Sequence, residues 1–213
     1  MKWHDKIGNR IVVLNLSHRE DRLLEFTEQA EKYSIPFLRI ESIHDKESGA
    51  RGLRDTILKL FNEEILNETK HLLVFEDDAE CVVPPEEFNS VMEKVIDQLP
   101  GNYHMVFLGG QLTNRISHFH SENLIPVQKF FATHAVLYSL EGMKAVVASN
   151  LGYPIDNHLV EAVQPLGGCY CVYPLLFGQR PGMSDIYNNF IDWSVFIQGR
   201  YEQKIVEYKQ GLR

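Results

Sequence analysis

The sequence contains few cysteines and no long apolar run. Its three cysteines among 213 residues, Cys81, Cys169 and Cys171, are too few and too irregularly spaced for a disulfide framework. Cys169 and Cys171 would share one face of a strand, where a common metal is conceivable. No matching Cys/His pair lies at zinc-site spacing, so two small strand residues are the favoured interpretation. No apolar stretch approaches the roughly 18 residues of a membrane-spanning helix, so we expect no transmembrane segment.

Positive charge is also scarce. Lys and Arg together number 21 against 29 Asp and Glu, which gives a formal net charge of −8. This balance disfavours a nucleic acid as partner or acceptor, unless a local basic groove exists. The N-terminal residues, Met1 to Lys6, lack the apolar region of a signal peptide. We therefore expect a cytoplasmic protein, with peripheral contact to the inner membrane as an alternative.

The first half of the chain alternates short apolar runs with amphipathic segments. Residues 11–16, 37–40, 72–75 and 103–108 have the length and composition of buried strands, and helical spacing separates them. Such alternation predicts an α/β fold with a mostly parallel central sheet, right-handed crossovers and flanking helices.

Local signals suggest where the helices begin. Ser17 and Glu20 form a capping box that predicts the start of the first helix. Gly49 and Gly52 are typical of a loop before the second helix. The absence of a linker, repeat or low-complexity tract favours one domain over residues 1–190, followed by a helical arm over residues 191–213.

The second half is less regular. Residues 130–138 and 169–174 read as strands and residues 140–151 as a short helix. Residues 111–127 are polar and irregular, which suits either a flexible loop over a site or a surface connection. Residues 179–186 are expected to form a loop.

Three consecutive acids follow the third predicted strand. Glu76, Asp77 and Asp78 come directly after an apolar run, and like charges this close repel unless a cation joins them. A divalent metal prefers carboxylate oxygens, whereas the alternative is a solvated acidic turn. Ligands of open parallel sheets bind beyond the carboxyl ends of the strands, where Asn15 and these acids are expected to lie. This placement favours a functional site.

Five segments, in order, resemble glycosyltransferase family 25, which includes lipooligosaccharide and procollagen galactosyltransferases. Residues 11–22 resemble the opening "INL…R.DR" of that family, and residues 73–78 its "LILEDD" segment. Residues 133–135 are similar to a "(T)HAY" strand, and residues 154–156 to a proline–hydrophobic–aspartate helix start. Residues 173–186 resemble the closing "YP…Q…SDI". Together the motifs span most of the chain.

The resemblance implies a GT-A fold, a nucleotide-sugar donor with a UDP-sugar favoured, and inversion at the anomeric carbon. It also implies a divalent metal, Mn²⁺ or Mg²⁺. One departure concerns the family's "GC.LSH" segment, because Ile57 stands at its histidine position. That departure bears on substrate identity more than on fold.

The resemblance assigns donor-binding roles to the first and third strands. Asp78 is expected to ligate the metal, with Glu76 as a second ligand. Glu76 and Asp77 would also orient the ribose, metal-bound water or an arginine. Asn15 and Leu16 are expected to hold the base or ribose of the nucleotide.

Other charged residues have competing interpretations. Arg19 and Arg22 are expected to reach a phosphate or the acids, the alternative being solvated first-turn arginines. An inverting enzyme needs a general base, for which Asp156 is the first candidate and Asp185 the second. The alternative for Asp156 is a helix N-cap, and for Asp185 a ligand at the metal or donor sugar. For His134 a satisfied structural histidine is favoured over a metal or diphosphate contact.

The expected function is metal-dependent sugar transfer, with galactose among the candidate sugars. The acceptor would be a hydroxyl of a glycan, a lipid-linked molecule or another compound, in lipooligosaccharide or other glycan biosynthesis. A first alternative is an inactive GT-A domain that binds a sugar nucleotide or glycan. A second is a phosphate-transfer receiver or phosphatase, whose acids should follow the first strand, where this chain has Asn15 and Leu16.

Overall fold

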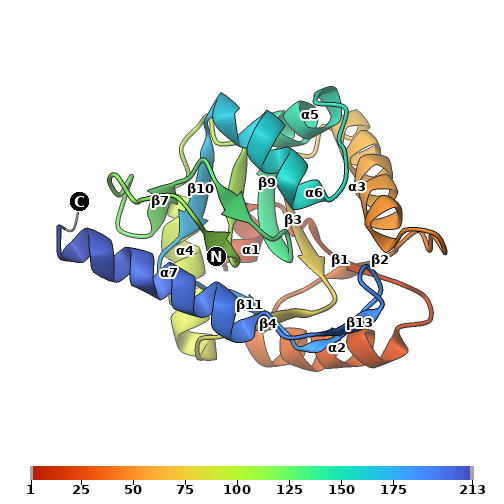
Figure 1. Cartoon of the computed structure of the whole chain (residues 1–213). Helices are drawn as coiled ribbons and strands as arrows, with labels where there is room; N and C mark the ends of the chain where they lie inside the picture. Colours follow the sequence, from red (N-terminus) through yellow and green to blue (C-terminus); the bar gives the residue numbers. More distant parts are fainter. Residues whose placement is uncertain (1, 212–213) are drawn as a thin grey trace.

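A seven-stranded mixed sheet forms the centre of the computed structural model, which describes residues 2–211, with only the backbone described for residues 194–198 (Figure 1). The strands, in order across the sheet, are β2 (Leu38–Glu41), β1 (Ile11–Asn15), β3 (His71–Glu76), β9 (Ala135–Ser139), β5 (Met105–Phe107), β10 (Cys169–Val172) and β7 (Leu124–Pro126). All run in one direction except β9 and β7, which are antiparallel to their neighbours. The predicted α/β class with a mostly parallel sheet is confirmed.

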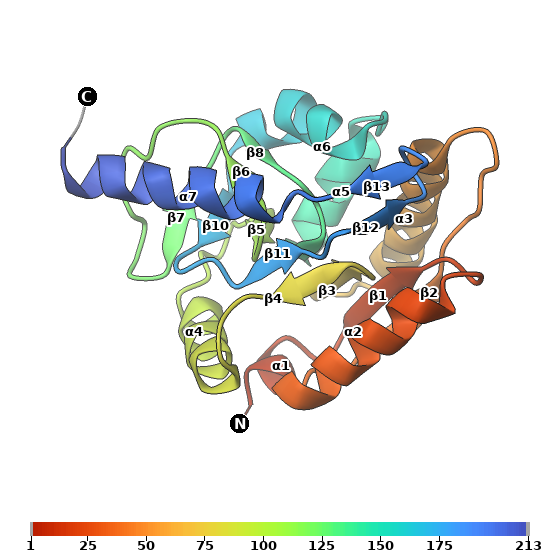
Figure 2. The same ribbon diagram turned by 60° about the horizontal axis from the view of Figure 1, so that its bottom comes forward.

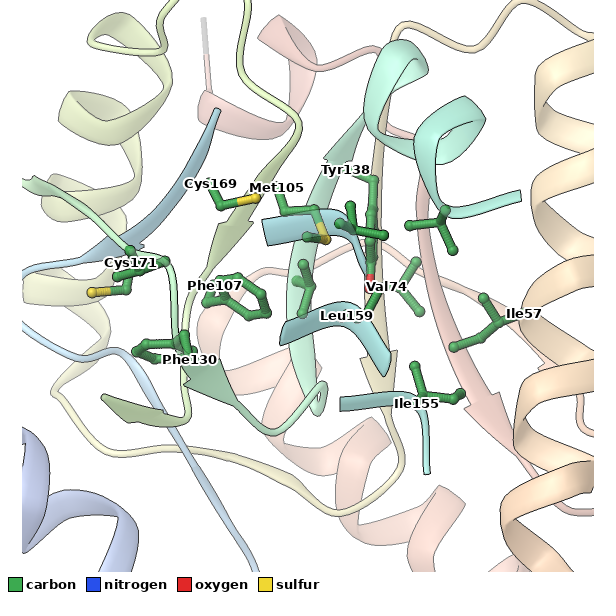
Figure 3. Packing of buried hydrophobic residues seen from close by; sticks show 14 of the residues in the cluster. Ile57, Val74, Met105, Phe107, Phe130, Tyr138, Ile155, Leu159, Cys169 and Cys171 are labelled. Atoms are coloured by element: carbon green, nitrogen blue, oxygen red, sulfur yellow. The ribbon is translucent and has the colours of Figure 1, made fainter. Parts of the chain in front are cut away.

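Helices cover both faces of the sheet, because alternate residues of its strands point to opposite sides. Val12 and Val74 belong to a core cluster with the helices α3 and α5, whereas Val13 and Phe75 pack with α1, α2 and α4. The helices are α1 (Trp3–Lys6), α2 (Glu20–Tyr33), α3 (Gly49–Leu66), α4 (Pro85–Asp97), α5 (Leu140–Ala148), α6 (Ile155–His158) and α7 (Ser194–Lys209). Figure 3 shows the first cluster, in which Ile57 of α3 faces Val74 of β3.

The helix starts differ from the sequence prediction. The capping box is wrong: α2 begins at Glu20 with Arg19 at the N-cap position, and no side chain caps it. The reason is a turn in which the Arg19 amide donates to the Leu16 carbonyl (2.9 Å), so Ser17 lies before the helix. The Arg19 side chain instead forms hydrogen bonds with the carboxylates of Asp21 and Asp185.

The loop predicted around Gly49 and Gly52 is also wrong, because both glycines lie in the first turns of α3. Ser48 is the N-cap and accepts a hydrogen bond from the Arg51 amide (3.3 Å). The glycines do not form a turn; they allow the backbone of other segments to lie close to α3. A Cβ at Gly52 would lie 2.4 Å from the Ile43 carbonyl oxygen.

Two predicted elements of the second half are broken up. The strand expected over 130–138 splits into β8 (Phe130–Phe131) and β9, because Ala132 between them adopts a left-handed φ of 74°. The loop expected over 179–186 contains β12 (Gly182–Ser184), which pairs with β13 (Asn189–Ile191) as a hairpin. Other short pairs join β4 (Ala79–Cys81) to β11 (Phe177–Gln179), and β6 (Gln111–Leu112) to β8.

The C-terminal helix α7 lies along the outside of the molecule, beside β11 and the β6–β8 pair (Figure 2). Tyr201 and Ile205 are buried in the first core cluster, and the Tyr201 hydroxyl donates to the Val172 carbonyl (2.5 Å). The helix predicted for the tail is therefore present. Within residues 2–211, no helix combines the length and apolar character needed to cross a membrane.

Candidate functional site

The three acids lie where β3 leaves the sheet. Glu76 is the last residue of β3, and Asp77 and Asp78 form the turn that leads to β4. Because β1 and β3 are parallel, their carboxyl ends meet, and the Asn15 Nδ2 donates to Asp77 Oδ2 (2.8 Å). The Asn15 side chain is buried and also accepts a hydrogen bond from the Arg39 Nε (2.9 Å), which fixes the amide that donates to Asp77.

Strand alternation divides the acids between two sides. Glu76 has the same parity as Val74 and lies on the side of α3, where the Thr133 hydroxyl donates to its Oε1 (2.7 Å). Asp77 has the parity of Phe75 and lies on the side of α2. Thr133 belongs to the "(T)HAY"-like segment, but its sequence context predicted no role for it.

Arg22, from the first turn of α2, bridges two of the acids. Its Nη1 donates to Asp77 Oδ1 and to Asp78 Oδ2, both at 3.0 Å. Its Nη2 donates to the Met183 carbonyl of β12 (2.7 Å). Gln179 adds a hydrogen bond to Asp78 Oδ2 (3.2 Å). Of the two partners expected for Arg22, a phosphate or the acids, the structure shows contact with the acids.

Burial makes Glu76 and Asp77 costly to ionise. Desolvation raises the pKa of Glu76 to about 8, the Asp78 charge adds to this increase, and the Thr133 hydrogen bond opposes it. Burial and the Asp78 charge also raise the pKa of Asp77, against the hydrogen bonds from Asn15 and Arg22. A further cation would therefore stabilise the ionised cluster.

Unpaired polar atoms mark the same place. Among the described residues, Asp78 Oδ1 and both ring nitrogens of His134 are buried without a hydrogen-bond partner. His134 is buried, and desolvation lowers its pKa against the Asp78 charge and the Phe177 carbonyl, which act to raise it. A Cβ at Gly109 would lie 2.4 Å from His134 Nε2, so only glycine leaves room for this ring.

Two adjoining cavities open above the sheet edge. The first, of about 560 Å³, lies between the β1 and β3 ends, the N-terminus of α3 and the β12–β13 hairpin, and its lining includes Leu16, Arg22 and Asp185. The second, of about 250 Å³, includes Thr133, His134 and Asp156. Both are lined by Leu53, Glu76, Gln179, Ile186, Tyr187 and Trp193. Glu76 is thus the carboxylate at the junction.

The donor set fits a divalent metal that shares its ligands with a substrate. Within residues 2–211, no three His, Cys, Asp or Glu side chains are grouped as a metal site. Mg²⁺ in nucleotide enzymes commonly takes one or two carboxylates, with substrate phosphates and water completing its shell. Asp78 offers a buried, unpaired Oδ1, and Glu76 is adjacent, so these two residues meet that requirement.

The two candidate bases lie apart. Asp156 is in the first turn of α6, whose N-cap is Pro154, so the N-cap alternative is wrong. Asp156 lines the second cavity, and its charge contributes to the raised pKa of Glu76. Asp185 lines only the first cavity of the two and bonds Arg19 Nη1 (2.6 Å) and His18 Nε2 (3.2 Å).

The environment of Asp185 favours its ionised form. Burial acts to raise its pKa, but the hydrogen bonds from Arg19 and His18 outweigh burial and lower it. Arg19 also bonds Asp21 and the Met183 carbonyl (3.1 Å). Arg19 and Asp185 therefore form a pair that fastens the hairpin to α2. This hairpin was not predicted, because residues 179–186 were expected to form only a loop.

Comparisons with known proteins identify no family. No protein-family model matches the sequence, and no curated protein matches it. Solved structures of similar arrangement include A197 from STIV, with 12% identity, 85% of this chain and 91% of that chain covered, and a TM-score of 0.48. A glycosyltransferase involved in glycosylation of the major capsid of PBCV-1 has 15% identity, coverage of 72% and 74%, and a TM-score of 0.45. Apo-UDP-glucose pyrophosphorylase has 12% identity, coverage of 99% and 85%, and a TM-score of 0.47. At these values the similarity assigns no activity to the chain.

Proposed function

We propose that this protein is a metal-dependent glycosyltransferase of GT-A type that transfers a sugar, with inversion, from a nucleotide-sugar donor to an acceptor hydroxyl. The observation that carries the proposal is the acid cluster at the junction of two cavities, with Asp78 Oδ1 buried and unpaired. The first cavity is the larger and suits the donor, whereas the second suits the acceptor. A UDP-sugar is the favoured donor, and galactose is the first sugar to test.

The leaving diphosphate requires positive charge beside the acids. Asp78 and Glu76 would hold Mn²⁺ or Mg²⁺, which when bound neutralises charge on the leaving diphosphate. Arg22 and Arg19 line the same side of the site and would add positive charge near the phosphates. Leu16 would contact the nucleoside, and Asn15 would keep Asp77 in place.

The acceptor hydroxyl requires a base on the opposite side of the donor sugar. Asp156, in the second cavity, would take the hydroxyl proton while the acceptor oxygen attacks the anomeric carbon. The bond from that carbon to the diphosphate breaks, and the diphosphate leaves with the electron pair. Asp185 is the weaker candidate, because Arg19 and His18 occupy its carboxylate and lower its pKa.

Asp78→Ala tests the proposal. The wild-type protein with Mn²⁺ should slowly hydrolyse a responsive UDP-sugar, and Asp78→Ala should reduce this turnover at least about 100-fold, because the leaving diphosphate loses its electrostatic partner. UDP release measures the rate. Asp97→Ala removes an exposed carboxylate that pairs with Lys6 and serves as the matched control. Donor turnover that is equal in Asp78→Ala and wild type would refute the role of Asp78.

The alternative of a catalytically inactive domain rests on Ile57, which stands where the family has histidine. Ile57 is 3% exposed and packs in the core between α3 and the sheet (Figure 3). The departure therefore removes no side chain from either cavity. Calorimetry that detects metal-dependent nucleotide binding without turnover of any common donor would favour the inactive domain.

A further inference from the structure

We propose that Arg22 is a built-in counter-ion of the acid cluster, which weakens the binding of a metal ion on its own and links the cluster to the β12–β13 hairpin. The inference rests on the proposed function only in expecting a divalent cation at Asp78. It assigns Arg22 a positioning role, because Arg22 acts through the acids and the hairpin rather than on the sugar.

The geometry of Arg22 supports the first part of this role. One guanidinium nitrogen, Nη1, lies 3.0 Å from a carboxylate oxygen of both Asp77 and Asp78. The side chain is only 13% exposed, so water screens these contacts little. Gln179 also donates to Asp78 Oδ2, so Oδ1 is the oxygen of that carboxylate that has no hydrogen bond.

A divalent cation at Asp78 Oδ1 would therefore share its carboxylate with a fixed positive charge. Two cations on one carboxylate repel strongly in a partly buried site. A diphosphate brings negative charge that relieves this repulsion. The arrangement thus favours joint binding of metal and diphosphate over binding of the metal alone.

The second part of the role concerns the hairpin, which lies next to α2 in Figure 1. Arg22 Nη2 and Arg19 Nη1 both donate to the Met183 carbonyl, at 2.7 and 3.1 Å. On the opposite side, a Cβ at Gly49 of α3 would lie 2.4 Å from the Asp185 carbonyl oxygen. The hairpin is thus held between α2 and α3.

The hairpin position affects both cavities. Ile186 and Tyr187 lie between β12 and β13 and line both cavities, together with Trp193, which follows the hairpin. A shift of Arg22 away from Asp78 would change its bond to Met183 as well. Occupation of the acid cluster is therefore coupled to the walls of both cavities.

The test is titration with Mn²⁺ alone, without any nucleotide, followed by calorimetry at pH 8. Arg22→Gln should bind Mn²⁺ at least about tenfold more tightly than wild type, because the competing charge is gone. Arg22→Lys should bind with an affinity between the two. Arg54→Gln is the matched control, because Arg54 pairs with Asp55 (2.7 Å) and lines neither cavity. Its affinity should remain that of wild type.

If Arg22 had only a structural role, Arg22→Gln would lower both the stability of the protein and its affinity for Mn²⁺. A higher Mn²⁺ affinity in this variant therefore distinguishes the counter-ion role from a structural one. Equal or weaker Mn²⁺ binding in Arg22→Gln, or no Mn²⁺ binding in any of the proteins, would overturn the proposal. If Arg22→Gln fails to fold, the comparison of Arg22→Lys with wild type decides in the same way. Donor turnover is not used, so failure here leaves the proposed sugar transfer standing.

The coupling has its own readout. The chain has two tryptophans, and Trp3→Phe leaves Trp193 as the single reporter beside the hairpin. In that background, Mn²⁺ should change Trp193 emission, and adding Arg22→Gln should alter the metal-free spectrum and abolish the response. An identical Mn²⁺ response with and without Arg22 would refute the link to the hairpin.

Discussion

Glu76 lies half-buried at the end of β3, where Asp77, Asp78 and Asp156 all act on its ionisation. Its neighbours differ in how they are satisfied. Asp77 has bonds from Asn15 and Arg22, whereas Glu76 has the Thr133 hydroxyl and lies between the two cavities. Glu76 therefore has fewer hydrogen bonds to offset its buried charge than Asp77 has, and it lies at the junction of the cavities where the reaction is proposed to occur.

The raised pKa of Glu76 makes stability depend on pH. In the unfolded chain Glu76 loses its proton near pH 4.5, but in the folded protein it keeps the proton up to about pH 8. The folded state therefore binds more protons between these values, and the free energy of unfolding falls as pH rises from about 5 to 8. In metal-free buffer we expect a loss of roughly 3–4 kcal/mol across this window.

Glu76→Gln tests this dependence, because an amide does not ionise and can still accept from Thr133. Denaturant unfolding at pH 5 and pH 8 should show a clearly smaller difference for the variant than for wild type. The same slope in both proteins would contradict the assigned state of Glu76.

At the scale of elements, the site depends on segments that are far apart in the sequence. The β12–β13 hairpin bonds Arg22 of α2, which also bonds the acid cluster, and Arg19, the N-cap residue of α2. It also contacts the N-terminus of α3. β9 enters between β3 and β5 in antiparallel orientation and brings Thr133 and His134 to the end of β3. The phosphate-transfer receiver requires acids after the first strand, whereas β1 ends at Asn15.

Gly49→Ala tests the contact between α3 and the hairpin. The added Cβ would lie 2.4 Å from the Asp185 carbonyl oxygen, so the hairpin must move. We expect a loss of about 1–2 kcal/mol in stability and weaker nucleotide binding. Gly199→Ala in α7 is the control, because its Cβ would meet nothing within 4 Å and should stabilise the helix by up to about 1 kcal/mol. Thermal unfolding of both variants gives the comparison, and equal stability in the two would refute the contact.

At the scale of the whole molecule, one core lies on each face of the sheet, and α7 joins the first of them. Tyr201 is 3% exposed, and its hydroxyl bonds the last residue of β10. The boundary predicted near residue 190 separates this helix from a domain with which it shares a core. That boundary stays a prediction for experiment.

Tyr201→Ala tests whether α7 unfolds with the rest. Loss of a buried aromatic side chain and its hydrogen bond should cost about 3–4 kcal/mol in one cooperative transition. Val206→Ala, at a 49% exposed position of the same helix, should change stability by less than about 0.5 kcal/mol. Circular dichroism and tryptophan fluorescence should report the same midpoint. Two separate transitions would instead support an independent arm.

Much of the site's location could be predicted from the sequence, because it depends on local patterns. An apolar run followed by Glu76, Asp77 and Asp78 already indicates acids at a strand end, and the alternation of strands and helices places that end at a ligand-binding edge. Strand parity even separates Glu76 from Asp77, since successive residues point to opposite faces.

Packing between distant segments determines which groups contact those acids. Arg22 and Met183 are 161 residues apart, and nothing local in either segment specifies their hydrogen bond. The same holds for the insertion of β9, for the burial of Ile57 and for the glycines of α3, whose missing side chains matter because distant backbone approaches them. Local sequence determines what a residue can offer, whereas packing between distant segments determines which partner it finds and which oxygen of Asp78 stays open.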